Sequence, residues 1–263
     1  MVLIIEVNQI KKIKKIRINR TIFFVLSVMI FTFSCSDQSL NDEQLSISCA
    51  NTKEKLWSLS NLSEFEKDKF NLLYQERLLS YIDEFKEAAK LNNLDWELLA
   101  AIAFQESQWN PKARSATQVK GMMMLTLPTA KSLGVDNRLD PVQSINGGAS
   151  YIAKLIDEIN FGTSTGDTIS IALAAYNLGV GNINRYLEEI QINSKKENFE
   201  ITWDDLSSFL TEEVNHNELI GNSTNYKRGI QAVDYVTRVK DYYYLILGLS
   251  LIHISEPTRR LRI

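Results

Sequence analysis

Glu106 is the side chain in this 263-residue sequence whose position most directly suggests chemistry. It lies near the end of the segment LDWELLAAIAFQES, in which Asp95 is a suitable N-cap and nothing breaks a helix before Asn110-Pro111. The apolar stripe of that helix comprises, at i, i+3 and i+4, Leu99, Ile102 and Ala103. Position i+7 on the same face is Glu106, so the helix directs a carboxyl group toward its own buried side.

Burial would give this carboxyl group the properties of a general acid. Loss of solvation penalises the charged form and raises the pKa, so a buried carboxyl group stays protonated near neutral pH. The alternative is that the helix is rotated slightly and Glu106 reaches solvent, or pairs with Lys112 or Arg114. The local pattern alone leaves both interpretations open.

Other polar groups occur where apolar segments end. Tyr176 and Asn177 close a stretch, residues 168–177, that is apolar on almost every side, and they need hydrogen-bond partners if they are buried. The segment GMMML at residues 121–125 suits flexible core packing. Several tyrosines follow near the C-terminus, namely Tyr226, Tyr235, Tyr242, Tyr243 and Tyr244. Core packing explains each of these features equally well when it is taken alone.

The composition excludes several kinds of chemistry. Residues 36–248 hold 20 basic and 30 acidic side chains, a net charge of −10, which argues against nucleic-acid binding. Only Cys49 and His216 remain in that range, too few for an ordinary zinc site. His216 lies in the polar stretch TEEVNHNELIGNS, which is typical of a solvated surface. We therefore expect no metal and no cofactor, and a reaction carried out by carboxyl and tyrosine side chains.

The hydropathy pattern is helical almost throughout and predicts a mainly α domain at residues 63–248. Ser63 and Glu66 have the spacing of a capping box, and Thr126 and Ser144 are suited to cap two later helices. A polar insertion is expected at residues 191–225, with one short helix at 203–210. Further helices are expected over residues 78–89, 168–177 and 228–247, and no strand is expected.

The first 34 residues have the composition of an export signal. Six basic side chains and one acidic side chain precede the apolar run TIFFVLSVMIFTFS at residues 21–34, which is shorter than the roughly 20 residues of a membrane span. Thr32-Phe33-Ser34-Cys35 resembles the lipobox of a bacterial lipoprotein. We expect residues 1–34 to be a signal peptide, Cys35 to be lipidated, and residues 35–62 to form a flexible tether.

The C-terminal segment does not look native. Residues 249–259 read LSLIHISEPTR, which resembles the translation of an untrimmed sequencing-library adapter. We therefore expect residues 249–263 to be foreign to the natural protein and to lack a fixed place in the core.

Four motifs together resemble, in their order and spacing, the catalytic domain of the lytic transglycosylases. They are Glu106-Ser107, GMMMLTLPTAKSLG at 121–134, ALAAYNLGVGNI at 172–183 and YKRGIQAVDYVTRV at 226–239. The resemblance extends from about Leu78 to Leu247. The three-methionine form is most similar to the F branch of the membrane-bound lytic murein transglycosylases. That branch carries a substrate-binding-protein-like domain before the catalytic domain, and we expect this domain to be missing here.

The resemblance implies a mainly α, lysozyme-like fold with a groove for peptidoglycan glycan strands. Glu106 would be the single catalytic carboxyl group, which protonates the bond between N-acetylmuramic acid and N-acetylglucosamine. It would then take a proton from the muramyl C6 hydroxyl, and a 1,6-anhydro ring would close. The residues implied to orient the site or bind the sugar are Ser107, Met122, Met123, Met124, Tyr176, Asn177 and Tyr235.

Two other functions stay open at this point. A muramidase that hydrolyses the same bond needs a second carboxylate, for which the candidates are Asp136, Asp140 and Asp167. A lipoprotein that only binds peptidoglycan needs none. In all three cases the expected partners are peptidoglycan and a membrane reached through the lipid anchor, and the expected location is the periplasmic face of the outer membrane.

Overall fold

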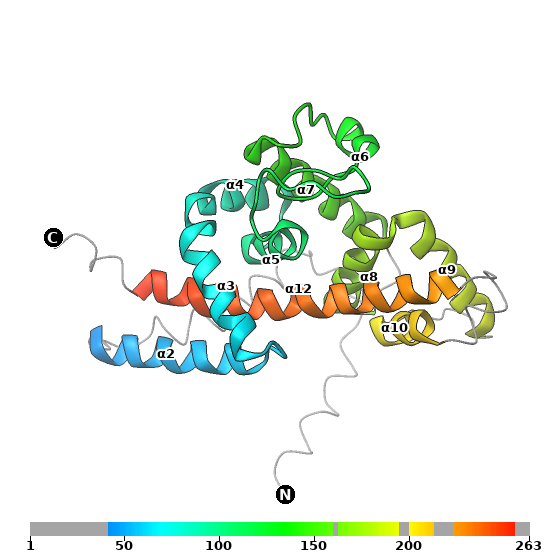
Figure 1. Ribbon diagram of the computed structural model, residues 1–263. Coiled ribbons are helices and arrows are strands. Elements are labelled where there is room, and N and C mark those ends of the chain that lie inside the picture. The colour runs from blue at the N-terminus through cyan, green and yellow to red at the C-terminus, as the bar shows by residue number, and fades with distance from the viewer. Residues whose placement is uncertain (1–41, 160–162, 195–199, 213–222, 256–263) are drawn as a thin grey trace, which may run out of the picture. The chain divides into compact units, whose positions relative to one another are not determined.

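The computed structural model describes residues 42–159, 163–194, 200–212 and 223–255. The helices in these ranges are α2 (Asp42–Ser58), α3 (Glu64–Glu76), the 3-10 helix η2 (Leu78–Ser80), α4 (Ile82–Asn92), α5 (Trp96–Ser107), α6 (Leu127–Ser132), α7 (Pro141–Glu158), α8 (Thr165–Leu178), α9 (Val180–Ser194), α10 (Trp203–Thr211) and α12 (Ser223–Ser255), as Figure 1 shows. Only isolated bridges pair extended backbone in the described residues. The predicted mainly α class is confirmed.

Most of the residues predicted to cap helices do occupy N-cap positions. The Ser63 hydroxyl accepts a hydrogen bond from the Glu66 N–H, and the Glu66 carboxylate accepts one from the Ser63 N–H, which is a complete capping box at the start of α3. Thr126 caps α6 through the Thr129 N–H. Asp95 is the N-cap residue of α5, but its side chain makes no capping hydrogen bond.

The prediction that Ser144 caps a helix is wrong. α7 begins one turn earlier, where Asp140 accepts a hydrogen bond from the Gln143 N–H and Pro141 occupies the first helical turn. Ser144 is fully buried inside that helix and its hydroxyl is used elsewhere.

Three further segments differ from the predictions. Residues 42–58 of the expected tether form the helix α2, in which the Trp57 indole N–H donates to the Leu245 carbonyl. α9 was not predicted. α12 continues through Ser255, and Leu249 is buried, so the expectation that the segment after Gly248 lacks a fixed place in the core is wrong at that residue. The foreign origin of residues 249–263 stays a prediction.

Several predicted features lie outside the described residues, among them the signal peptide, the lipidation site Cys35 and His216. Within the described ranges, no helix combines the length and the apolar character that crossing a bilayer requires.

The described residues from Ala50 onward form one compact unit in which α12 packs against α5, α8 and α10 (Figure 1). Aromatic rings fill the space around the end of α5. The Phe104 ring lies 4.7 Å from Phe70, 4.6 Å from Trp109 and 4.5 Å from Tyr242, measured between centroids. Because edge and tilted ring contacts restrict ring orientation, this cluster holds the C-terminal turn of α5 against α3 and α12.

Candidate active site

The last turn of α5 places Glu106, and the chain is fixed just beyond it. Gln108 and Trp109 both adopt positive φ angles, 53° and 56°, which end the helix abruptly. The buried Trp109 indole N–H donates to the Ala100 carbonyl at 2.9 Å, and an Arg77 guanidinium N–H donates to the Gln108 carbonyl at 2.9 Å. These long-range bonds hold the helix end in one position, so the Glu106 side chain starts from a rigid backbone.

Glu106 meets Tyr235 of α12. The Tyr235 hydroxyl donates to Glu106 Oε1 at 2.7 Å, and Tyr235 is buried. Burial raises the pKa of Glu106 from its ordinary 4.5 to about 7, and the hydrogen bond from Tyr235 offsets part of that rise. Glu106 is half-buried, and its carboxyl group points toward the buried Tyr235, which agrees with the predicted direction. Neither Lys112 nor Arg114 forms an ion pair with it in the described part of the chain.

The backbone of the three-methionine segment is hydrogen-bonded to Ser107, which follows Glu106 in the sequence, and to Tyr176 of α8. The Ser107 hydroxyl donates to the Met122 carbonyl at 2.7 Å, and the Tyr176 hydroxyl donates to the Met123 carbonyl at 2.8 Å. Burial, followed by the charge of Glu106, raises the pKa of Tyr176 well above its usual range, so this tyrosine stays a donor. The structure thus brings α5, α8 and the methionine segment together at one place.

Gly121 permits the turn that starts this segment. Its φ is +87°, and a Cβ atom there would lie 1.7 Å from the Arg138 carbonyl oxygen. The Arg138 guanidinium in turn donates to the Leu125 and Gln118 carbonyls, each at 2.9 Å. Gly121 is therefore required by both conformation and space.

The three methionine side chains differ in exposure. Met122 and Met123 are fully buried, so their side chains pack in the core. Met124 is only half-buried and has a φ of +46°. Asn177 is exposed at the end of α8, next to the half-buried Tyr176. Of the residues predicted to orient the site or bind sugar, Asn177 is thus the exposed one, and the sugar-binding roles stay predictions.

Two residues in this arrangement were missed by the sequence analysis. The buried Ser144 hydroxyl accepts a hydrogen bond from the Met123 N–H at 3.1 Å. Gly148 lies against Met123, and a Cβ atom there would be 2.6 Å from its side chain. The Gly147-Gly148 pair inside a helix is a signal in the sequence for such a close approach.

The candidate second carboxylates have structural partners. Asp140 accepts the Gln143 N–H at the start of α7. Asp167 accepts the Ser164 N–H at the start of α8 and also the Trp203 N–H, and its pKa is lowered to about 2 although burial acts in the opposite direction. Asp136 is exposed. No group of three or more potential metal ligands occurs in the residues that the structure describes.

The class of domain follows from comparison with known families. Residues 83–199 match the family model of the transglycosylase SLT domain. This part of the chain, which contains Glu106, the methionine segment and Tyr176, is therefore similar to a transglycosylase SLT domain. Tyr235 lies outside the matched residues and reaches the site from α12.

Individual relatives agree with this assignment. A membrane-bound lytic murein transglycosylase F from Photobacterium profundum is 41% identical over 165 residues, which are 63% of this chain and 32% of that protein. A protein of the same name from Shewanella loihica is 40% identical over 177 residues, 66% of this chain and 36% of that protein. The chain thus spans about a third of the length of these relatives.

A solved structure was also matched. The 70 kDa soluble lytic transglycosylase from Escherichia coli is 22% identical, with a TM-score of 0.44 over 81% of this chain and 31% of that chain. The similarity to the lytic transglycosylases, and to the F branch among them, rests on the sequence matches.

Proposed function

We propose that this chain is a peptidoglycan lytic transglycosylase. It cleaves the β-1,4 bond between N-acetylmuramic acid and N-acetylglucosamine and leaves 1,6-anhydromuramyl ends. The observation that carries the proposal is Glu106, a carboxyl group whose pKa is raised to about 7 by burial and whose hydrogen-bond partner is Tyr235. The SLT domain match and the names of the relatives support the substrate and the type of reaction.

In the first step Glu106 acts as an acid. Its proton goes to the glycosidic oxygen, and the bond from that oxygen to the muramyl C1 breaks. The carbonyl oxygen of the muramyl N-acetyl group attacks C1 from the other side, so the substrate supplies the group that a second carboxylate provides in ordinary glycosidases. One protein carboxyl group is then sufficient.

In the second step the ionised Glu106 acts as a base. It takes the proton of the C6 hydroxyl, O6 attacks C1, and the N-acetyl oxygen leaves. Glu106 is protonated again, and no water is consumed. A pKa near 7 suits both steps, because neither form of the group is strongly disfavoured at neutral pH. The Tyr235 hydroxyl donates to the carboxylate and stabilises it between the two steps.

Residues beside Glu106 form the surface that binds the sugar. Ser107 and Tyr176 hold the backbone of the methionine segment beside Glu106, and this segment shapes a sugar subsite through its backbone and Met124. Asn177 is exposed, and among the described residues its amide has no protein partner, so it is available to the muramyl residue.

The muramidase alternative is less well supported. Hydrolysis by the two-carboxylate route requires a second carboxylate that activates water, but Asp140 and Asp167 are engaged at helix starts and Asp136 is exposed. A binding protein without activity would have no use for a carboxyl group with a raised pKa, whose burial disfavours its charged form.

We further propose that the protein acts from a membrane surface in the cell envelope. The basic segment, the apolar run before Cys35 and the lipobox-like sequence support an acylated N-terminus. Two or three acyl chains, at roughly 0.8 kcal/mol per buried CH₂ group, hold a protein on a membrane where one chain is marginal. The periplasmic face of the outer membrane is the location we propose.

Glu106→Gln tests the proposal. Glutamine is nearly isosteric with the protonated acid but transfers no proton, so release of anhydromuropeptides from purified peptidoglycan should fall by a factor of about 10² to 10⁴. Glu97→Gln is the matched control, since Glu97 lies on the same helix and burial also raises its pKa. It should keep activity within about threefold. Activity of Glu106→Gln within tenfold of the wild type would refute the assignment.

A further inference from the structure

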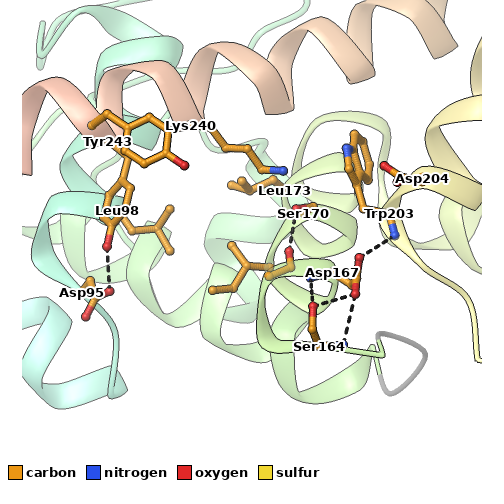
Figure 2. Close-up of a pocket in the computed structure, with 13 residues that line it drawn as sticks. Asp95, Leu98, Ser164, Asp167, Ser170, Leu173, Trp203, Asp204, Lys240 and Tyr243 are labelled. Atoms are coloured by element: carbon orange, nitrogen blue, oxygen red, sulfur yellow. Dashed lines mark hydrogen bonds between the residues drawn. The ribbon is translucent and has the colours of Figure 1, made fainter. Parts of the chain in front are cut away.

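A pocket that the proposed reaction does not use lies between α5, α8, α10 and α12 (Figure 2). Its volume is about 460 Å³, which is in the range of small-ligand sites. Glu106, Tyr235 and Tyr176 are not among its lining residues. Leu98, which lines it, lies about 12 Å along α5 from Glu106 at the helical rise of about 1.5 Å per residue. The pocket is therefore separate from the candidate active site.

Lys240 brings a positive charge into this pocket. Figure 2 shows its side chain extending from α12 toward Trp203, and its Nζ lies 5.6 Å from the centre of the Trp203 ring. Within the described residues, Lys240 forms no ion pair. Burial lowers the pKa of Lys240, although the charges of Asp167 and Asp204 act in the opposite direction. An ammonium group in this position gains from a carboxylate ligand.

Asp167, one of the two acids near this lysine, has other partners. Asp167 accepts hydrogen bonds from the backbone of Ser164 and of Trp203, and from the Thr163 hydroxyl. The carboxylate oxygens of Asp167 are therefore engaged by donors at the starts of α8 and α10. Asp204 is exposed at the rim of the pocket. In the described part of the chain its carboxylate accepts no hydrogen bond from a helix start, so it remains available near Lys240.

The walls of the pocket are aromatic and aliphatic. Figure 2 shows Tyr243 of α12 on the side opposite to Trp203, and the Tyr243 hydroxyl donates to Asp95 at 3.2 Å. Tyr244 of α12 also lines the pocket. Aliphatic lining comes from Leu98, Ile169 and Leu173. A short peptide with methyl and methylene groups fits such walls, whereas the two carboxylates beside Lys240 and the net charge of −10 over residues 36–248 disfavour a phosphate or a polyanion.

We propose that this pocket is a second binding site, for the stem peptide of peptidoglycan, with a peptide carboxylate on Lys240 and a peptide amino group facing Asp204. The choice of peptidoglycan as the source rests on the proposed function. The site anchors a peptide-bearing strand away from the point of cleavage. It therefore lowers KM for strands that carry peptides and leaves kcat unchanged.

Binding of a free peptide tests this proposal without any cleavage. The probe is a synthetic stem tetrapeptide that contains a diamino acid, titrated calorimetrically into the full chain carrying Glu106→Gln. Adding Lys240→Gln should weaken binding by about tenfold or more, because a charge-assisted hydrogen bond is lost. Lys240→Arg should restore most of the affinity. Lys227→Gln, at an exposed lysine on the same helix, should have no effect. The peptide with amidated carboxyl groups should bind weakly to every variant.

Kinetics separate this site from the active site. With Glu106 intact, Lys240→Gln should raise KM about tenfold on peptide-bearing strands and change nothing on strands stripped of peptides by an amidase. Equal loss on both substrates would mean that Lys240 has only a structural role. Unchanged peptide affinity in Lys240→Gln, or no peptide binding to the parent chain, overturns the pocket proposal. Products without anhydro ends would instead overturn the proposed function, whatever the peptide affinities are.

Discussion

Replacing Tyr235 by phenylalanine removes the hydroxyl that donates to Glu106 Oε1 at 2.7 Å and leaves the ring in its buried position. A hydrogen bond to a charged group contributes about 1.5 to 3 kcal/mol. Because one pKa unit corresponds to about 1.4 kcal/mol, loss of this bond should raise the pKa of Glu106 by about one to two units above its value of about 7.

The sign of the effect on activity follows from the role of Glu106. Only the protonated group donates to the glycosidic oxygen, so kcat/KM of the wild type should decline as the pH rises through about 7. In Tyr235→Phe the decline should move to higher pH by about one to two units. The rate at low pH should also fall, because the carboxylate formed in the first step loses its donor.

The assay is the initial rate on soluble glycan strands, measured from about pH 5 to pH 10. Tyr242→Phe is the matched control, since Tyr242 lies on the same helix and interacts with Arg238. Its pH profile should coincide with that of the wild type. A decline in Tyr235→Phe at the wild-type pH, or at a lower pH, would refute the account of how Glu106 is controlled.

Three other perturbations have expected outcomes. Glu106→Gln should make the free energy of unfolding less dependent on pH between about 4.5 and 7. In the wild type Glu106 ionises at a lower pH in the unfolded chain than in the folded one, so the free energy of unfolding falls as the pH rises, by about 3 kcal/mol at most. Chemical denaturation at several pH values measures this, and parallel pH profiles of the two proteins would contradict it. Gly121→Ala should lower the free energy of unfolding by about 2 kcal/mol or more. Gly134 has a φ of +72° but no atom within 4 Å of a new Cβ, so Gly134→Ala should lower it by about 1 kcal/mol. Equal losses of stability in the two variants would contradict the steric argument. Cys35→Ser should abolish metabolic labelling by a fatty-acid analogue, and an unlabelled wild type would defeat the lipoprotein proposal.

Local signals in the sequence were sufficient for most helices. The capping box at Ser63 and the cap at Thr126 depend on residues within one turn, so they are visible without tertiary structure. The Asp-Pro pair at residues 140–141 was an equally local signal for the start of α7, and the serine one turn later was wrongly preferred. α2 was interpreted as tether because its sequence is polar, and its Trp57 finds a partner 188 residues away.

The site was predictable in part. The i+7 position of Glu106 on an apolar stripe indicated a carboxyl group directed inward, and in the structure burial raises its pKa to about 7. Its contact with Tyr235 joins residues 129 positions apart, and no local pattern distinguishes this tyrosine from its neighbours on α12. Only the family resemblance singled it out. The position of Met123 likewise depends on α7, which supplies Ser144 and Gly148 from a later part of the sequence.

The central claim is that Glu106 transfers a proton twice and that no water enters the product. Digestion of purified peptidoglycan in water enriched in the heavy isotope of oxygen, followed by mass spectrometry of the released muropeptides, tests it most directly. The account predicts muramyl ends that are one water lighter than reducing ends and carry no heavy oxygen. Reducing ends that contain the heavy isotope would contradict it and would identify the enzyme as a hydrolase.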